Sequence, residues 1–482
     1  MSLQDIFNVF ISSLFLGYSL FLMGGYIFIG LYSIGELKKY LRKNSFTNYR
    51  LLANSAQAPK ISIIAPAYNE GANIIENVRS LMSIYYSNLE VIIVNDGSKD
   101  DSLDKLINAY ELYKSEFFVN EQIPTKKVRG VYKSRNIIYS KLVVVDKENG
   151  GKADALNVGI NVSKNDYIVC IDVDCILEQD AILKLVKPFL EASKHRVIAT
   201  GGVVRIANSC EVVDGRLVKV NLPKQLLPRL QTLEYIRAFL LGRMAWSRLG
   251  GLMLISGAFG AFDKEIAVKC GGYNHKTVGE DMELVVRMRR YMEEHKIPYR
   301  VSFIPDPLCW TEAPSTFKIL ARQRNRWTRG TIETLKLHKV MFFNPKYHLM
   351  GMLSYPYWFA FEFLAPIIEF VGFIYFNLFI LFGEINVNFS LSLLLMVYTF
   401  GVLYSVFGIL MEVRTYNQYK GRKDTLKLLL AATIEPLILH PFGVWHAIMG
   451  NIDLLRKKSS WGEMTRAGFT NPPKKPNLLE SK

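Results

Sequence analysis

Two aspartates that follow an apolar run are the clearest candidates for chemistry in this sequence. The run Tyr167–Asp172 is almost entirely apolar, and Asp174 follows Asp172 with one residue between them. Side chains at i and i+2 of an extended chain share a face, so the two carboxylates should lie close together and repel each other. A divalent cation that bridges a diphosphate would neutralise them, and oxygen ligands suit Mg2+ or Mn2+. The structural alternative is a solvated loop with two acids.

A second acidic group stands at a predicted helix start. Glu280 and Asp281 end the segment Thr277–Asp281, and alternating polar and apolar residues follow them. Acidic residues at a helix N-terminus are favoured by capping and by the helix dipole, which is a sufficient structural explanation. The functional interpretation is that Asp281 is a general base, which takes a proton from an attacking hydroxyl.

Further polar residues follow other predicted strands. Tyr68 and Glu70 come after the first strand, and Asp96 comes after the second, in front of Gly-Ser. Carboxylates at these places can accept hydrogen bonds from a base or a ribose, although Asp-Gly-Ser alone is an ordinary turn. Lys152 opens a helix directly after two glycines, an arrangement that can hold phosphate. The glycine spacing does not match a P-loop, so it does not indicate a kinase or an ATPase.

A cluster of large polar side chains lies near residue 325. Gln323, Arg324, Arg326 and Trp327 place two guanidinium groups beside an indole. Arginine suits bidentate contacts with phosphate, and the indole gives a sugar an apolar face on which to stack. The alternative is a basic helix at a membrane surface.

The elements that must position these residues follow from the periodicity between residues 60 and 329. Short β-branched runs alternate there with helical stretches such as Gly71–Tyr85 and Lys152–Val162. This alternation predicts an α/β, doubly wound and mainly parallel sheet that binds ligands at the carboxyl ends of its strands. The basic region 114–138 is interpreted as an insertion that could include an edge strand. The predicted strands are Ile61–Ala65, Val91–Asn95, Leu142–Asp146, Tyr167–Asp172 and Val197–Val204.

Long apolar stretches flank this region. Residues 7–34 can span a bilayer, and the lysines and arginines just after them should stay in the cytosol. Further apolar stretches occupy about 350–383, 389–412 and 428–451. The first is too long for one upright span, so we expect an additional crossing or a re-entrant piece, broken near Pro366. Residues 330–350 interleave basic and apolar residues, which predicts an interfacial helix, with a plain surface helix as the alternative.

The bulk composition agrees with a mixed membrane and soluble protein. The 482 residues are 50% hydrophobic, and the net charge of +16 favours anionic lipid or a phosphorylated small molecule as partners rather than nucleic acid. Five dispersed cysteines indicate a reducing compartment. The predicted units are a membrane anchor (1–44), a cytosolic α/β domain (45–330), an interfacial helix with a transmembrane bundle (331–455) and a cytosolic tail (456–482).

Together, these motifs resemble the family-two, inverting, membrane-embedded glycosyltransferases with a GT-A fold. This family includes the cellulose, hyaluronan and chitin synthases and bacterial poly-N-acetylglucosamine synthase. The resemblance covers about residues 60–330 and the order of the membrane segments. It implies that Asp96 binds uracil, that Asp172 and Asp174 bind metal and UDP, and that Asp281 supplies the base. One departure is Gly279, which stands where the family motif Thr-Glu-Asp has threonine.

The resemblance extends to two further segments. Gln323, Arg326 and Trp327 match a Q-x-x-R-W motif that lies near the acceptor and the donor diphosphate. In the tail, Trp461 and Arg466 resemble, with two residues inserted, a W-G-T-R segment that closes over the diphosphate in hyaluronan and chitin synthases. A basic juxtamembrane anchor is the alternative for the tail. The closing role requires a cytosolic tail, and therefore an even number of crossings after the α/β domain.

The expected function is transfer of a sugar from a nucleotide sugar, UDP-hexose or UDP-N-acetylhexosamine, to a growing β-linked polysaccharide with inversion. The reaction is expected to need Mg2+ or Mn2+. The polysaccharide is expected to be exported across the plasma membrane. The basic residues after the first span place the catalytic domain of this multi-pass protein in the cytosol, and export partners are a further expectation. Two alternatives stay open. One is a non-processive enzyme that adds a single sugar to a lipid acceptor, and the other is a membrane scaffold or transporter with an inactive transferase domain.

Overall fold

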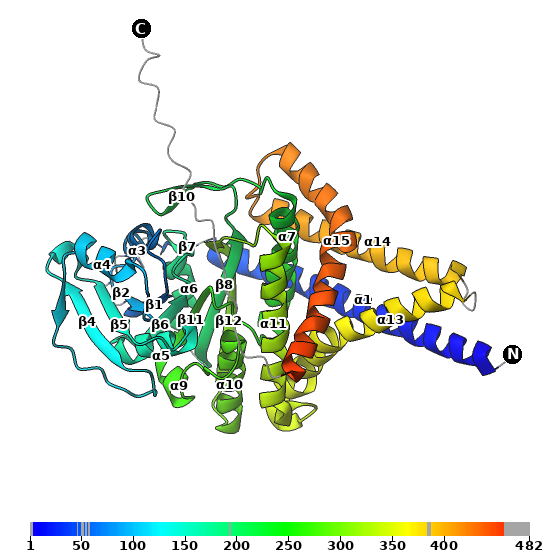
Figure 1. Ribbon diagram of the computed structural model, residues 1–482, viewed down its shortest axis with the longest axis horizontal. Helices are drawn as coiled ribbons and strands as arrows, with labels where there is room; N and C mark the ends of the chain where they lie inside the picture. The colour runs from blue at the N-terminus through cyan, green and yellow to red at the C-terminus, as the bar shows by residue number, and fades with distance from the viewer. Residues whose placement is uncertain are drawn as a thin grey trace, which may run out of the picture.

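The molecule joins an α/β domain to a set of long apolar helices that project from one side of it (Figure 1). The N-terminal end of the chain lies at the far tip of these helices. The computed structural model describes residues 3–45, 47–49, 53, 55, 58–191, 194–382 and 387–456.

The α/β domain is built on a ten-stranded mixed sheet in the order β3-β4-β5-β2-β1-β6-β11-β8-β12-β7. Its strands are β1 (Ile61–Ala67), β2 (Leu89–Asn95), β3 (Leu112–Ser115), β4 (Val128–Ser134), β5 (Leu142–Lys147), β6 (Tyr167–Ile171), β7 (Ile176–Leu177), β8 (Arg196–Ile206), β11 (Phe259–Asp263) and β12 (Tyr299–Thr311). A separate hairpin consists of β9 (Glu211–Val213) and β10 (Arg216–Lys219).

The predicted parallel sheet is confirmed at its centre. Strands β5, β2, β1 and β6 are parallel, and β8 is parallel to β12. β11 runs antiparallel between β6 and β8, so it closes the gap between the two parallel groups. β3 and β4 form the antiparallel edge within the basic insertion. The β-branched residues of the central strands are buried on both faces, as parallel strands require.

Helices surround this sheet and connect its strands. Those of the α/β domain are α3 (Ile74–Met82), α4 (Ser102–Ala109), η1 (Ile137–Tyr139), α5 (Lys152–Val162), α6 (Ala181–Leu190), α7 (Leu226–Ile236), η2 (Arg237–Arg243), α8 (Met244–Leu249), α9 (Lys264–Lys269), α10 (Glu280–Glu294) and α11 (Phe317–Leu337). The predicted helix Lys152–Val162 has the bounds of α5.

Four described helices are long and apolar enough to cross a membrane. They are α1 (Leu3–Asn44), a helical run that ends in α13 (Ala365–Leu381), α14 (Val387–Thr415) and α15 (Arg422–Leu455). α1, α13 and α14 pack through aromatic contacts far from the sheet, for example Phe15 on Phe376 and Tyr26 on Tyr404. Figure 1 shows these three helices extending side by side away from the α/β domain.

Two expectations for the region after α11 are wrong. No single interfacial helix occupies 330–350, because α11 ends at Leu337 and only short turns follow, η3 (Lys339–Met341) and η4 (Pro345–Tyr347). Further along, Pro345 lacks an amide hydrogen and disfavours helix for Asn344, so no continuous helix runs through this point.

The expected break near Pro366 is also absent. The chain stays helical through η5 (Met350–Ser354), α12 (Tyr355–Trp358) and η6 (Phe359–Leu364) into α13. η6 is a π-helical turn, and Pro366 follows directly at the start of α13. A wide turn at this junction accommodates the missing proline amide without ending the helix. The segment is therefore one helical passage, without the additional crossing that we expected.

α15 packs on the α/β domain along most of its length. Near its start, Leu428 and Ala432 join a buried cluster with Leu230 and Leu233 of α7. Toward its end, the Asp453 carboxylate accepts a hydrogen bond from Asn325 of α11 at 2.9 Å. In Figure 1, α15 runs beside α11 and crosses the direction of α13 and α14. α15 therefore forms the seam between the α/β domain and the projecting helices.

Buried ion pairs hold this seam together. Arg205 of β8 pairs with Glu412 of α14, and both side chains are 1% exposed. Arg237 makes two hydrogen bonds with the Glu435 carboxylate of α15, at 3.0 and 2.9 Å. Leaving one member of such a pair without its partner is costly, so these pairs fix how the two parts meet.

Candidate active site

The loops after β1 and β2 are joined by hydrogen bonds at the carboxyl edge of the sheet. The Asn69 amide donates to Ser98 Oγ at 3.0 Å, and the Glu70 amide donates to Ser102 Oγ at 3.0 Å. Asn69 has a positive φ of 56°, which suits asparagine and turns the chain sharply after the strand. Tyr68, which precedes this turn, is 46% exposed and free to contact a ligand from this edge.

Asp96 is buried beneath the glycine loop that precedes α5. Its carboxylate accepts hydrogen bonds from Lys147 Nζ at 2.5 Å, from Gly150 N at 3.0 Å and from Gly151 N at 2.8 Å. Lys147 is fully buried and also pairs with Asp154 at 2.8 Å. Asp96 therefore fixes the loop that presents Lys152, and its predicted contact with uracil stays a prediction.

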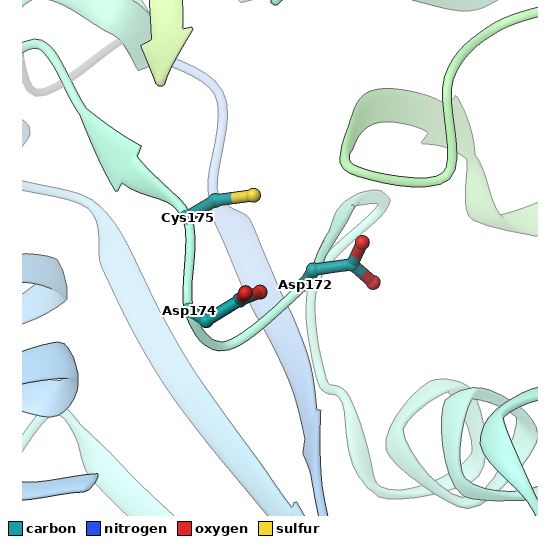
Figure 2. A group of neighbouring side chains, drawn as sticks. All are labelled: Asp172, Asp174 and Cys175. Carbon is teal, nitrogen blue, oxygen red and sulfur yellow. The ribbon is translucent and has the colours of Figure 1, made fainter. Parts of the chain in front are cut away.

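Asp172 and Asp174 lie in the turn that follows β6. One ligand atom from each of these two carboxylates and the Cys175 sulfur lie within 4.8 Å of one another. Figure 2 shows the three side chains directed to the same side of the turn. Strand β6 ends at Ile171, so the turn rather than an extended strand brings the carboxylates together. Two carboxylate groups at this spacing offer the hard oxygen ligands that Mg2+ or Mn2+ prefers.

Lys152 lies between two acidic groups. Its Nζ is 2.5 Å from Asp172 Oδ1 and 3.8 Å from Glu280 Oε1. Burial by itself would lower the pKa of Lys152, but the carboxylates of Asp172 and Glu280 outweigh burial and raise it. The ammonium is thus held charged beside Asp172, a place from which it can contact a phosphate.

The Asp281 carboxylate faces this cluster from the start of α10. Its Oδ2 accepts a hydrogen bond from the Gly257 amide at 2.9 Å. A Cβ at position 257 would lie 3.1 Å from Asp281 Oδ2 and 3.2 Å from Lys152 Nζ, so the glycine permits the close approach of these groups. The predicted base and the predicted phosphate-binding lysine therefore share one site.

Glu280 also belongs to this site, although its sequence position beside Asp281 predicts no separate role. It is 4% exposed. Burial raises the pKa of Glu280 to about 7, and Asp281 adds to the rise, while Lys152 and Arg326 oppose it. A carboxyl group that titrates near neutrality beside the predicted base is typical of a functional site.

We predict that Glu280 makes the metal-free protein less stable as the pH rises. The folded protein keeps this proton up to about pH 7, whereas an unfolded chain releases it near 4.5. Between these values the folded state binds more protons, so stability falls with rising pH, by on the order of 3 kcal/mol. Thermal unfolding in chelator should show this slope, and Glu280→Gln should flatten it. An equal slope in the variant would contradict the assignment.

α11 brings its residues to the same region with different roles. Arg326 is close enough to Glu280 to oppose the rise of its pKa. Arg324 is instead bound to Glu234 of α7 through both guanidinium ends, and its guanidinium lies 4.6 Å from the centre of the Trp327 ring. It supports the indole here, and its predicted phosphate contact stays a prediction. Gln323 Oε1 is buried without a hydrogen-bond partner among the described residues.

Some site residues were not found from the sequence. Lys147 carried a signal, because a lysine that ends an apolar strand is unusual. Gly257 carried none, because its role depends on a loop that folds back from far along the chain. The predicted tail residues Trp461 and Arg466 lie outside the described residues.

Comparison with known proteins places this geometry in context. A family model described as "Glycosyltransferase like family 2" matches residues 58–330, and one described as "Chitin synthase" matches residues 271–465. The poly-beta-1,6-N-acetyl-D-glucosamine synthase of Staphylococcus epidermidis is 28% identical over 313 residues, 64% of this chain and 64% of that protein. The probable glycosyltransferase YdaM of Bacillus subtilis is 28% identical over 300 residues, 61% of this chain and 60% of that one. The chain thus matches less than two thirds of the length of these relatives.

A solved structure resembles the fold. It is the mannosyltransferase PcManGT from Pyrobaculum calidifontis in complex with GDP-Man and Mn2+, with a TM-score of 0.50 and 16% identity. The likeness covers 91% of this chain and 99% of that one. At this identity it concerns the arrangement of the α/β domain and its helices, and not the choice of substrate.

Proposed function

Because the chain belongs to glycosyltransferase-like family 2 and is a glycosyltransferase with a GT-A fold, we propose that it extends a β-linked polysaccharide from a UDP-sugar with inversion. The donor is UDP-hexose or UDP-N-acetylhexosamine. The similarity to a poly-N-acetylglucosamine synthase supports the second of these donors. The acceptor is the growing polysaccharide, and a lipid-linked acceptor is the alternative.

The observation that carries this proposal is the convergence of acid and base groups on one site. Asp172, Asp174, Lys152 and Asp281 come from the turn after β6, the start of α5 and the start of α10. Direct contacts join Lys152 to Asp172, and Gly257 fits closely against both Lys152 and Asp281. Such a site can hold a diphosphate on one side and activate a hydroxyl on the other.

The donor set fits a divalent cation. Asp172 and Asp174 present carboxylate oxygens close together, and Mg2+ or Mn2+ takes such ligands. When bound, the cation supplies positive charge to the diphosphate of the donor. Lys152 and Arg326 add fixed positive charge at the same place, so that the charge on the departing UDP is stabilised.

Asp281 acts on the acceptor. Its carboxylate takes the proton of the attacking hydroxyl, and the Gly257 amide holds that carboxylate in position. The hydroxyl oxygen forms a bond with the anomeric carbon while the bond from that carbon to the diphosphate oxygen breaks. Attack from the face opposite the diphosphate inverts an α-linked donor to a β-linked product. Trp327 is 39% exposed and offers an apolar face to the acceptor sugar.

The membrane part supports a role at the bilayer surface. The protein is a membrane protein with several long apolar helices. The protein lies in the plasma membrane with its α/β domain on the cytosolic side. The end of α1 favours this orientation, because it carries the basic residues Lys38, Lys39, Arg42 and Lys43. α1, α13 and α14 cross the bilayer, and the polymer leaves the site toward them.

A donor screen tests the proposal. Purified protein in detergent or vesicles is incubated with UDP-N-acetylglucosamine, UDP-glucose and GDP-mannose, and released nucleotide and product mass are measured. Release of UDP with a ladder of β-linked sugars supports the proposal. A product with one sugar on lipid supports the non-processive alternative, and absence of release from every donor supports the inactive scaffold.

A further inference from the structure

We propose that Glu333 of α11 is a positioning residue for Asp281, which acts by holding the segment Thr277–Gly279 in place. This inference rests on the proposed glycosyl transfer and on Asp281 as its base. Glu333 belongs to the helix that carries Arg326 and Trp327, but it lies beyond them along the chain. It therefore links the helix of Arg326 and Trp327 to the segment in front of Asp281.

The contacts of Glu333 are made by a single oxygen. Its Oε2 accepts a hydrogen bond from Thr277 Oγ1 at 2.7 Å and another from the Val278 amide at 2.9 Å. Thr277 Oγ1 in turn accepts a hydrogen bond from the Gly279 amide at 3.1 Å. The three residues in front of Glu280 are thus fixed through one carboxylate oxygen of α11.

A backbone contact reinforces this attachment one turn earlier in α11. A Cβ added to Gly279 would lie 2.7 Å from the Cα of Gly330, and a Cβ added to Gly330 would lie 2.7 Å from the Cα of Gly279. Neither position tolerates a side chain without moving α11 away from the segment. This contact explains why glycine, and not threonine, stands at position 279.

The consequence reaches Asp281, because only Glu280 lies between it and Gly279. Its carboxylate is held on the other side by the Gly257 amide. Without Glu333, the segment in front of α10 loses its hydrogen bonds to α11, and the carboxylate can shift relative to the acceptor. A misplacement of about 1 Å can lower the rate of a reaction about 100-fold.

Two substitutions separate this role from others. Glu333→Ala removes the accepting oxygen, and we expect kcat to fall about tenfold or more, with donor KM and UDP affinity within about twofold of wild type. Glu333→Gln keeps an oxygen that accepts both hydrogen bonds, so kcat should stay within about threefold of wild type. A residue that acted through its charge would lose activity in both variants.

Three further variants test whether the loss of kcat comes from the attachment between Glu333 and Thr277. Lys336→Ala changes an exposed residue of the same helix and should leave kcat unchanged. Thr277→Val removes the hydroxyl that donates to Glu333 and should lower kcat in the same direction. The double variant Thr277→Val with Glu333→Ala should then be no worse than Glu333→Ala alone, because both remove the same attachment.

The results separate this inference from the proposed function. If wild type releases UDP and Glu333→Ala keeps wild-type kcat, or Glu333→Gln falls as far as Glu333→Ala, the positioning role is wrong and the function stands. If Glu333→Ala no longer binds UDP, Thr277→Val decides, and an unchanged kcat in it overturns the inference. If wild type transfers no sugar from any donor, the proposed function itself is wrong.

Discussion

Asp281→Asn should lower kcat about 100-fold or more while UDP binding stays close to that of wild type, because removal of a general base costs about 100- to 10,000-fold. The substitution is nearly isosteric. The Asp281 carboxylate accepts one hydrogen bond on each oxygen, from the Gly257 amide at 2.9 Å and from the Met282 amide at 2.8 Å, and the single asparagine oxygen keeps one of them. The shape of the side chain is thus kept, while the basic group and one accepted hydrogen bond are lost. UDP release and binding of UDP by calorimetry measure the two quantities.

The matched control is Asp104→Asn, which changes an exposed aspartate of α4 that lies outside the site. Its kcat should equal that of wild type. A purified Asp281→Asn variant that retains more than about a tenth of wild-type kcat, a loss below ~1.4 kcal/mol, would show that another group takes the proton.

Removal of divalent cations should abolish transfer, and Mn2+ or Mg2+ should restore it. The two carboxylates of Asp172 and Asp174 lie together in one turn, and Lys152 contacts Asp172 directly. A donor diphosphate brings more negative charge to the same place, so that binding without a cation is strongly opposed. Asp174→Asn should lose at least about 100-fold in kcat/KM and should weaken Mn2+ binding, since one ligand and one charge are removed.

Asp166→Asn provides the control for this pair, because Asp166 precedes β6 at the opposite end from Asp172 and is exposed. Its Mn2+ affinity and its rate should match those of wild type. Full activity of wild type in excess chelator would remove the cation from the proposed reaction.

The central fold followed from local patterns. Apolar β-branched runs marked β1, β2, β5, β6 and β8, and the turn residues after them marked the ligand edge. The antiparallel strand β11 was not predicted, because it pairs with β6 and β8, which precede it by many residues. Pairing between distant segments depends on the whole sheet and leaves little trace in a short window of sequence.

The candidate site, too, divides into residues that local sequence patterns predict and residues whose role depends on distant segments. Asp172, Asp174 and Lys152 were found because their types and spacing indicate a chemical use. Glu333 was not, because a glutamate on a polar helix face is ordinary until the segment that it binds is known. Likewise, the hydrogen bond that Asp96 accepts from Lys147 could not be predicted, because it depends on where β5 places Lys147.

The position of α15 has a consequence for the two ends of the chain. Hydrogen bonds and apolar contacts join it to α7, η2 and α11 from Leu428 to Asp453. α15 is apolar enough to cross a membrane, but a helix that is held along the α/β domain over this length favours a place at the membrane surface. We infer that the chain crosses three times, through α1, α13 and α14. An odd number of crossings puts the start of α1 and the end of α15 on opposite faces of the membrane, so that a fluorescent or enzymatic reporter fused at each end would sense a different compartment.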